Sequence, residues 1–92
     1  MQSLQPNDIL TRITRYNLIR NRRLVYIDVH EALHGQLAAP FVAVPNLINL
    51  IARQQYQGVG ETEAEALQNC LSKIENTSIE ALFPRQANPG NL

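Results

Sequence analysis

The stretch LVYIDVHE, residues 24–31, alternates between apolar and polar side chains along its whole length. In an extended chain, the residues that share its apolar side are Val25, Ile27 and Val29. This period of two is typical of a β-strand that buries one face and leaves the other accessible. We therefore expect a strand at 24–31, and the other elements are placed around it.

Two further strands are expected after the turn that contains Gly35. The apolar stretch 41–44 lies between Pro40 and Pro45, which suggests a strand that is at an edge or ends abruptly. Residues 51–57 are compatible with a third strand that runs into Gly58-Val59-Gly60. A helix over 46–56 is the alternative, because Leu47, Leu50 and Ile51 have helical spacing.

The most distinct local signal begins at Thr62, which forms a capping-box pattern with Glu65. An apolar stripe at helical spacing follows it, made of Leu67, Cys70, Leu71 and Ile74. We expect a helix at about 63–75. Thr77-Ser78-Ile79-Glu80 repeats the pattern, which predicts a short extra helical turn stopped by Pro84.

The N-terminal part of the chain is interpreted as a helix over about 7–20. Asn7 and Asp8 follow a proline and can serve as a cap. The apolar residues behind this cap, at helical spacing, are Ile9, Leu10, Ile13, Tyr16 and Ile19. Residues 21–23 then form a polar connection to the first strand.

Together these elements predict an α+β fold. Its expected form is a three-stranded antiparallel sheet with helices packed on one face, in the order α-β-β-β-α plus a short C-terminal helical turn. A chain of 92 residues fits a single domain, expected over 1–83. Residues 84–92 are rich in proline, glycine and asparagine and are expected to be a flexible C-terminal tail.

Composition and cysteine content restrict the classes of function. The longest apolar run is far shorter than a membrane span, and the N-terminus lacks the pattern of a signal peptide, so a cytoplasmic protein without a membrane partner is expected. Cys70 is the single cysteine, which agrees with a reducing compartment. The formal net charge of zero argues against non-specific phosphate binding as the main source of affinity.

Candidate catalytic groups are few. His30 and His34 fall on a strand and its turn, where they do not form a helical pair of metal ligands. Cys70 belongs to an apolar stripe, and the acidic residues near 61–65 are explained by helix capping and the helix dipole. We therefore expect no enzyme, no metal, no cofactor and no small-molecule substrate.

The order of elements, with GVGETEAEA at 58–66 joining the last strand to the last helix, resembles the double-stranded RNA-binding domain over about residues 6–76. This resemblance implies that the first helix and the turn at His34 face successive minor grooves of A-form RNA. The basic residues cluster in the first quarter of the chain and are almost all arginine. The candidate RNA-binding residues are Arg12, Arg15, Arg22, Arg23 and His34.

A second stretch, FVAVPNL at 41–47 followed by GETEAEAL at 60–67, is similar to the HicB antitoxin family. The similarity covers about residues 24–75. It implies a small domain that serves as a protein-binding scaffold and inhibits a small ribonuclease.

The favoured hypothesis is a non-enzymatic binding or regulatory module that acts through protein-protein interaction, with a protein partner or a homodimer. Its candidate interface residues are Leu47, Leu50 and Tyr56, although these side chains would equally serve to complete the core. The alternatives are structured-RNA binding through the arginine-rich N-terminal segment and an antitoxin-like inhibitor.

Overall fold

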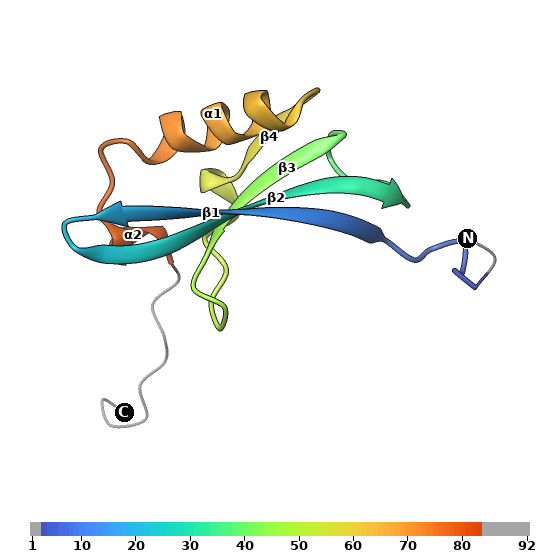
Figure 1. Cartoon of the computed structure of the whole chain (residues 1–92), viewed down its shortest axis with the longest axis horizontal. Coiled ribbons are helices and arrows are strands. Elements are labelled where there is room, and N and C mark those ends of the chain that lie inside the picture. Colours follow the sequence, from blue (N-terminus) through green and yellow to red (C-terminus); the bar gives the residue numbers. More distant parts are fainter. Residues whose placement is uncertain (1–2, 84–92) are drawn as a thin grey trace.

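The sheet of this protein has four antiparallel strands, not the three expected from the sequence. The computed structural model describes residues 3–83. The strands are β1 (Leu10–Arg20), β2 (Arg23–His34), β3 (Phe41–Asn46) and β4 (Gly58–Gly60). They lie side by side in sequence order, and helix α1 (Glu63–Ile74) runs along one side of the sheet (Figure 1). Residues of α1 and of the second helix, α2 (Ile79–Leu82), belong to a single core with the inward-facing residues of β2. The α+β class is retained, whereas the predicted order α-β-β-β-α is wrong.

The correction concerns the N-terminal segment, which is strand β1 and not a helix over 7–20. Tyr16 and Leu18 turn toward the core, while Ile13 and Ile19 alternate with them and are exposed. Apolar side chains on both faces of a strand hide its alternation, and the remaining spacing imitates a helix. The β-branched residues within the segment favour the extended chain.

A two-residue turn joins β1 to β2 and fixes their register. Asn21 and Arg22 both have positive φ, 51° and 67°, and Arg20 pairs with Arg23 across the turn. This is the type I′ geometry that matches the twist of a hairpin. Asparagine tolerates the left-handed region well, whereas arginine adopts it at a cost.

The predicted strands at 24–31 and 41–44 are confirmed as parts of β2 and β3. The strand expected at 51–57 is wrong: Gln54–Tyr56 forms a 3-10 turn, η1, and only Gly58–Gly60 pairs with β3. Pro45 is tolerated in β3 because it pairs with Ile27 at a position that requires no N–H toward β2.

Helix α1 (Glu63–Ile74) confirms the prediction at 63–75. Its N-cap Thr62 accepts a hydrogen bond from the Glu65 amide at 3.1 Å, as the capping pattern predicts. At the other end, the guanidinium of Arg20 donates to the carbonyl oxygens of Ile74 and Thr77, at 2.7 and 2.6 Å. This contact ties the end of α1 to the edge strand β1.

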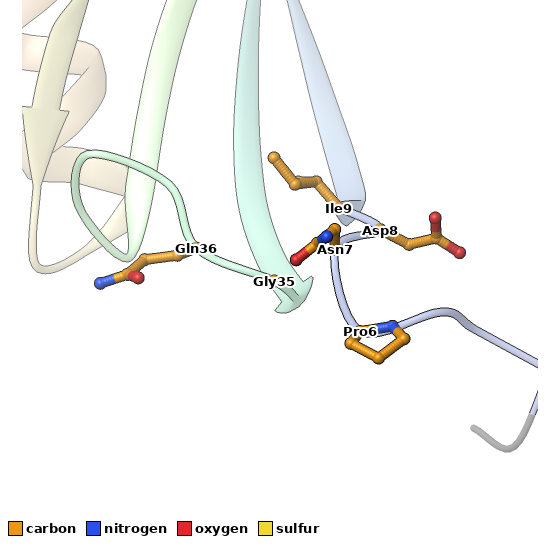
Figure 2. A pocket seen from close by; sticks show the side chains of 6 residues that line it. All are labelled: Pro6, Asn7, Asp8, Ile9, Gly35 and Gln36. Atoms are coloured by element: carbon orange, nitrogen blue, oxygen red, sulfur yellow. The ribbon is translucent and has the colours of Figure 1, made fainter.

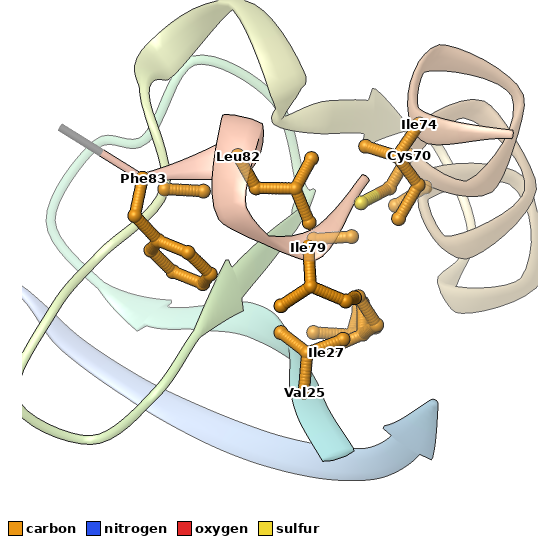
Figure 3. Packing of buried hydrophobic residues seen from close by; sticks show 11 residues of the cluster. Val25, Ile27, Cys70, Ile74, Ile79, Leu82 and Phe83 are labelled. Atoms are coloured by element: carbon orange, nitrogen blue, oxygen red, sulfur yellow. The ribbon is translucent and has the colours of Figure 1, made fainter. Parts of the chain in front are cut away.

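The predicted extra turn is helix α2 (Ile79–Leu82), capped by Ser78. It lies near the β1–β2 turn (Figure 1) and packs into the same core as α1 (Figure 3). The fully or nearly buried side chains of this core come from β2, β3, both helices, the loop after β3 and the residue that follows α2. They are Val25, Ile27, Val29, Ala43, Ala52, Ala66, Cys70, Ile74, Ile79, Leu82 and Phe83. The core therefore lies on one face of the sheet only.

Helix α1 sits directly on the short strand β4. A Cβ added to Gly58 would lie 2.3 Å from the amide nitrogen of Cys70 and 2.4 Å from the carbonyl oxygen of Ala66. Glycine thus allows the helix and the strand to approach each other closely. Within residues 3–83, no helix is long and apolar enough to cross a membrane. The predicted tail at 84–92 lies outside the described residues.

Candidate binding surface

The face of the sheet opposite the helices is the candidate binding surface, and we call it the open face. Alternation along the strands and the pairing register assign its residues. They are Ile13, Arg15, Asn17 and Ile19 of β1, Leu24, Tyr26, Asp28 and His30 of β2, Val42, Val44 and Asn46 of β3, and Val59 of β4. Ile48 and Ile51, from the loop after β3, border it.

Much of this face is apolar and accessible to solvent. The exposed fractions are 49% for Ile13, 69% for Ile19, 67% for Ile48, 61% for Ile51 and 41% for Val59. Single exposed apolar residues are common on proteins, but a set gathered on one face is typical of an interaction site.

An ion pair occupies the centre of the open face. Arg15 donates to the two carboxylate oxygens of Asp28 from Nε and Nη2, at 2.8 and 2.9 Å. Asp28 is only 4% exposed and also accepts from the Asn46 amide at 2.6 Å. The guanidinium of Arg15 lies 4.3 Å from the ring centroid of Tyr26, in a cation-π contact. The centre of the face is thus polar but electrically balanced.

These contacts change the protonation of both partners. The hydrogen bonds from Arg15, and then that from Asn46, hold the pKa of Asp28 below its ordinary value, although partial burial opposes them. The hydrogen bond to Asp28 raises the pKa of Arg15. Both groups are therefore charged at neutral pH, and the pair is maintained.

Asn46 connects this polar centre to the loop that follows β3. Its Oδ1 accepts from the amide of Ile48 at 3.0 Å, while its Nδ2 donates to Asp28. Ile48 has φ of 71°, a conformation that β-branched residues rarely adopt. A strained residue of this kind persists where the surroundings hold it in place, and such positions cluster at functional sites. The network thereby fixes a loop that projects isoleucine into solvent.

A shallow hollow of about 250 Å³ lies between this loop and the sheet. Its walls are the Arg15–Asp28 pair and Asn46 on one side, and Ile48 and Ile51 on the other, with His30 and Val44 completing it. One imidazole nitrogen of His30, Nδ1, lies 3.0 Å from the Thr11 hydroxyl. Such a hollow can receive an apolar side chain above a polar floor.

The structure separates the predicted RNA-binding residues. Arg12 forms an ion pair with Glu31 at 3.7 Å, and Arg23 pairs with Glu80 at 2.6 Å near α2. Arg22 lies in the hairpin turn.

The two remaining candidates lie apart from each other. Arg15 points to the open face, while His34 lies at the far end of β2, 3.1 Å from the Gln5 carbonyl oxygen. The five candidates therefore form no single basic patch within residues 3–83.

The predicted interface residues Leu47, Leu50 and Tyr56 are half-buried and pack against the core. The apolar residues that face solvent are instead Ile48 and Ile51, their neighbours in the same loop. Sequence reasoning missed these two, together with Ile13 and Ile19, because the helical interpretation of β1 concealed the open face. The β-branched residues at 10–20 carried the signal that would have revealed it.

A second hollow lies at the N-terminal end of the sheet, around Gly35 (Figure 2). Its side chains point in different directions instead of converging; Asp8 and Gln36 extend to opposite sides. Gly35 has φ of 84°, and a Cβ there would lie 2.4 Å from the Asp8 carbonyl oxygen. The hollow thus lies where two backbone segments approach each other closely, and its polar groups do not converge on a common point.

The reactive groups of the described chain are engaged in structure. Burial raises the pKa of Cys70 to about 11, which makes it a poor nucleophile. Glu63 accepts from the hydroxyls of Tyr16 and Thr14, and it raises the pKa of Tyr16. Within residues 3–83, no group of three or more histidine, cysteine, aspartate or glutamate side chains is arranged to hold a metal ion.

Comparisons with protein-family models, with curated proteins and with solved structures found no match to this chain. The resemblances to the double-stranded RNA-binding domain and to the HicB family therefore stay predictions.

Proposed function

We propose that this chain is a non-enzymatic binding module whose contact surface is the open face, and that its partner is a protein presenting apolar side chains. One observation carries the proposal: the helix-free face gathers exposed isoleucine, leucine and valine around a balanced ion pair. Protein interfaces combine an apolar core with depleted net charge in this way, often with arginine and aromatic side chains at the centre.

The charge distribution supports a protein partner over RNA. Arg12, Arg15 and Arg23 are each paired with a carboxylate. A phosphate backbone would have to compete with these carboxylates. RNA affinity depends on the release of counterions by unpaired basic groups, so such pairing weakens it.

The hollow beside Ile48 supports a defined point of contact. Its loop is held by Asn46 and needs no large rearrangement to meet a partner. An anchoring side chain placed over Arg15 and Asp28 would exclude water from the ion pair. Isoleucine at positions 48 and 51 would supply most of the apolar contact.

The test uses photo-crosslinking in the native host with a crosslinking amino acid at position 51. A matched control carries the same amino acid at Gln68, which is exposed on α1 on the opposite side of the sheet. We expect a crosslinked protein from position 51, absent from position 68 and resistant to nuclease. With that protein purified, Ile48→Glu should weaken binding by roughly tenfold or more in calorimetry, because it places a charge in the apolar contact.

Two outcomes would refute the proposal. Crosslinking of the same partners from both positions would mean that the open face has no special role. Nuclease-sensitive material, with steeply salt-dependent binding of duplex RNA that is lost in Arg12→Ala and Arg15→Ala, would identify RNA as the partner.

A further inference from the structure

The two edges of the sheet differ in how they are protected. At the β4 edge, side chains of α1 cover the backbone: Asn69 donates to the Val59 carbonyl oxygen at 2.7 Å, and Lys73 to that of Gln57 at 2.8 Å. The β4 strand is also only three residues long. A short edge strand with covered backbone groups does not readily pair with another strand.

The β1 edge lacks these devices. Arg20 and Arg23 form the hydrogen-bonded pair next to the two-residue turn. Since hydrogen-bonded positions alternate along a strand, the even-numbered residues of β1 form backbone hydrogen bonds with β2. The backbone N–H and C=O groups of Ile13, Arg15, Asn17 and Ile19 therefore point away from β2. Within residues 3–83, no group forms a hydrogen bond with these outward amides and carbonyls. β1 has eleven residues and no proline, and its one irregularity lies at Leu10/Thr11. Long free edges of this kind are templates for strand pairing.

We propose that a second copy of this chain pairs with β1 in an antiparallel, two-fold symmetric manner, centred on Tyr16. The two sheets then form one continuous sheet of eight strands, with both open faces on the same side. The pairing uses about eight backbone hydrogen bonds, formed by the outward groups of both strands. A contact of this symmetry is self-complementary, as closed dimers require.

The side chains of β1 select this register. Centring on Tyr16 places Ile13 opposite the partner's Ile19, twice in the dimer, and Arg15 opposite the partner's Asn17. Both isoleucines are about half or more exposed in the single chain, at 49% and 69%. Arg15 engages Asp28 through Nε and Nη2, which leaves Nη1 to donate to an asparagine side chain. Apolar pairs opposite each other, such as Ile13 and the partner's Ile19, stabilise a sheet.

Neighbouring registers match less well. Centring on Arg15 would place the two Arg15 guanidinium groups opposite each other at the axis, where neither offers an acceptor to the other. Centring on Asn17 would place Arg15 opposite the partner's Ile19. On the helix side of the favoured register, Tyr16 meets the partner's Tyr16, and both are only half-buried in one chain.

The proposal goes beyond the proposed function, because it concerns the backbone edge of β1, although the side chains that select the register also belong to the open face. The experiment measures the dimer dissociation constant of the full chain by sedimentation, up to about 1 mM, the weak limit of specific association. Asn17→Pro removes an outward N–H and adds a ring at the edge, without removing any hydrogen bond to β2. We expect it to weaken the dimer by at least roughly 100-fold. The matched Asn17→Ala keeps the N–H and loses only the side-chain contact with Arg15, so it should weaken the dimer by no more than roughly tenfold.

A charge exchange tests the register independently of any proline effect. Ile13→Glu alone and Ile19→Lys alone should each weaken the dimer by roughly tenfold, because each places a charge opposite isoleucine. The double variant restores opposite pairs in both halves of the dimer, and its dissociation constant should return to within about threefold of the original. Circular dichroism of each variant checks that the monomer fold is retained.

Three outcomes would overturn the inference. A chain that stays monomeric at all concentrations would exclude the dimer. A dimer indifferent to Asn17→Pro but abolished by Ile51→Glu would show that two open faces associate instead. Failure of the double variant to recover would exclude the register. The proposed function is tested separately through position 51, so the two ideas can fail independently.

Discussion

Replacing Gly58 by alanine tests the placement of α1 on β4, which leaves the opposite face of the sheet free of this helix. The added Cβ would lie 2.3 Å from the Cys70 amide nitrogen and 2.8 Å from its Cα. These distances fall about 1 Å short of ordinary contact. Both atoms belong to the helix backbone, so no side chain can rotate away, and the whole helix has to move.

We expect Gly58→Ala to lower the free energy of unfolding by about 2–3 kcal/mol, at the upper end of overpacking effects. For a domain of this size, the melting temperature would fall by roughly 8–24 °C. Val59→Ala is the matched control, because this side chain is 41% exposed and its register places it on the open face, opposite the helices. Its cost should stay within about 1 kcal/mol.

The measurement is urea unfolding followed by circular dichroism, with the midpoint and the slope analysed separately. A lower midpoint with an unchanged slope would report a loss of native stability. If the free energy of unfolding of Gly58→Ala stayed within about 0.5 kcal/mol of that of the original chain, the helix would not sit on β4 as described. The assignment of the open face would then lose its basis.

Three further predictions follow from individual contacts. Arg20→Met removes the donor to the carbonyl oxygens at the end of α1 and should lower the free energy of unfolding, measured in urea, by about 1–2 kcal/mol. The control Arg22→Met, in the hairpin turn, should change this free energy by less than about 0.5 kcal/mol. Because hydrogen bonds from Arg15 lower the pKa of Asp28, its stabilising contribution is complete above the unfolded-state value of 3.8 and is lost as pH falls through the lower folded-state pKa. Asp28→Asn should therefore flatten the acid limb of the stability curve measured by urea unfolding; an unchanged limb would contradict the role of this pair. Burial raises the pKa of Cys70 to about 11, so a maleimide should label the native thiol at least roughly 100-fold more slowly than the urea-unfolded one, and equal rates would show that it is accessible.

Local signals in the sequence predicted the centre and the C-terminal half of the fold. The alternation at 24–31 gave β2, because its apolar residues lie on one face only. The capping pattern at Thr62 and the stripe through Cys70 and Ile74 gave α1 within one residue of its end. In both elements, the local preference and the tertiary packing agree.

The N-terminal strand was missed because two different surfaces of β1 need apolar residues. Tyr16 and Leu18 complete the core, while Ile13 and Ile19 face solvent. Ile13, Tyr16 and Ile19 come from both faces of β1 but share helical spacing, and the arginines between them add to the imitation of a helix. A polar connection was expected at 21–23, but its form as a tight hairpin turn was missed, since the second turn residue is an arginine in a conformation usual for glycine.

Only part of the candidate site was accessible to sequence reasoning. Arg15 was predicted to be an RNA-binding residue, whereas its guanidinium is bound to Asp28, thirteen positions away along the chain. That pairing depends on the β1–β2 register and cannot be inferred while β1 is interpreted as a helix. Leu47 and Leu50 identified the correct loop, but the strained conformation of Ile48 decides which of its side chains face solvent.

The residues that misled the interpretation of the sequence are also those on which the proposed pairing of β1 depends. Ile13 and Ile19 contribute little to the core of the single chain, since about half or more of each is exposed. Exposed isoleucine on a free edge strand favours aggregation, and natural edges usually carry charge or proline instead. In β1 the two nearby charges, Arg12 and Arg15, are neutralised by carboxylates of β2. An edge with apolar side chains and cancelled charges is suited to a regular partner strand, because both features that would repel such a strand are missing.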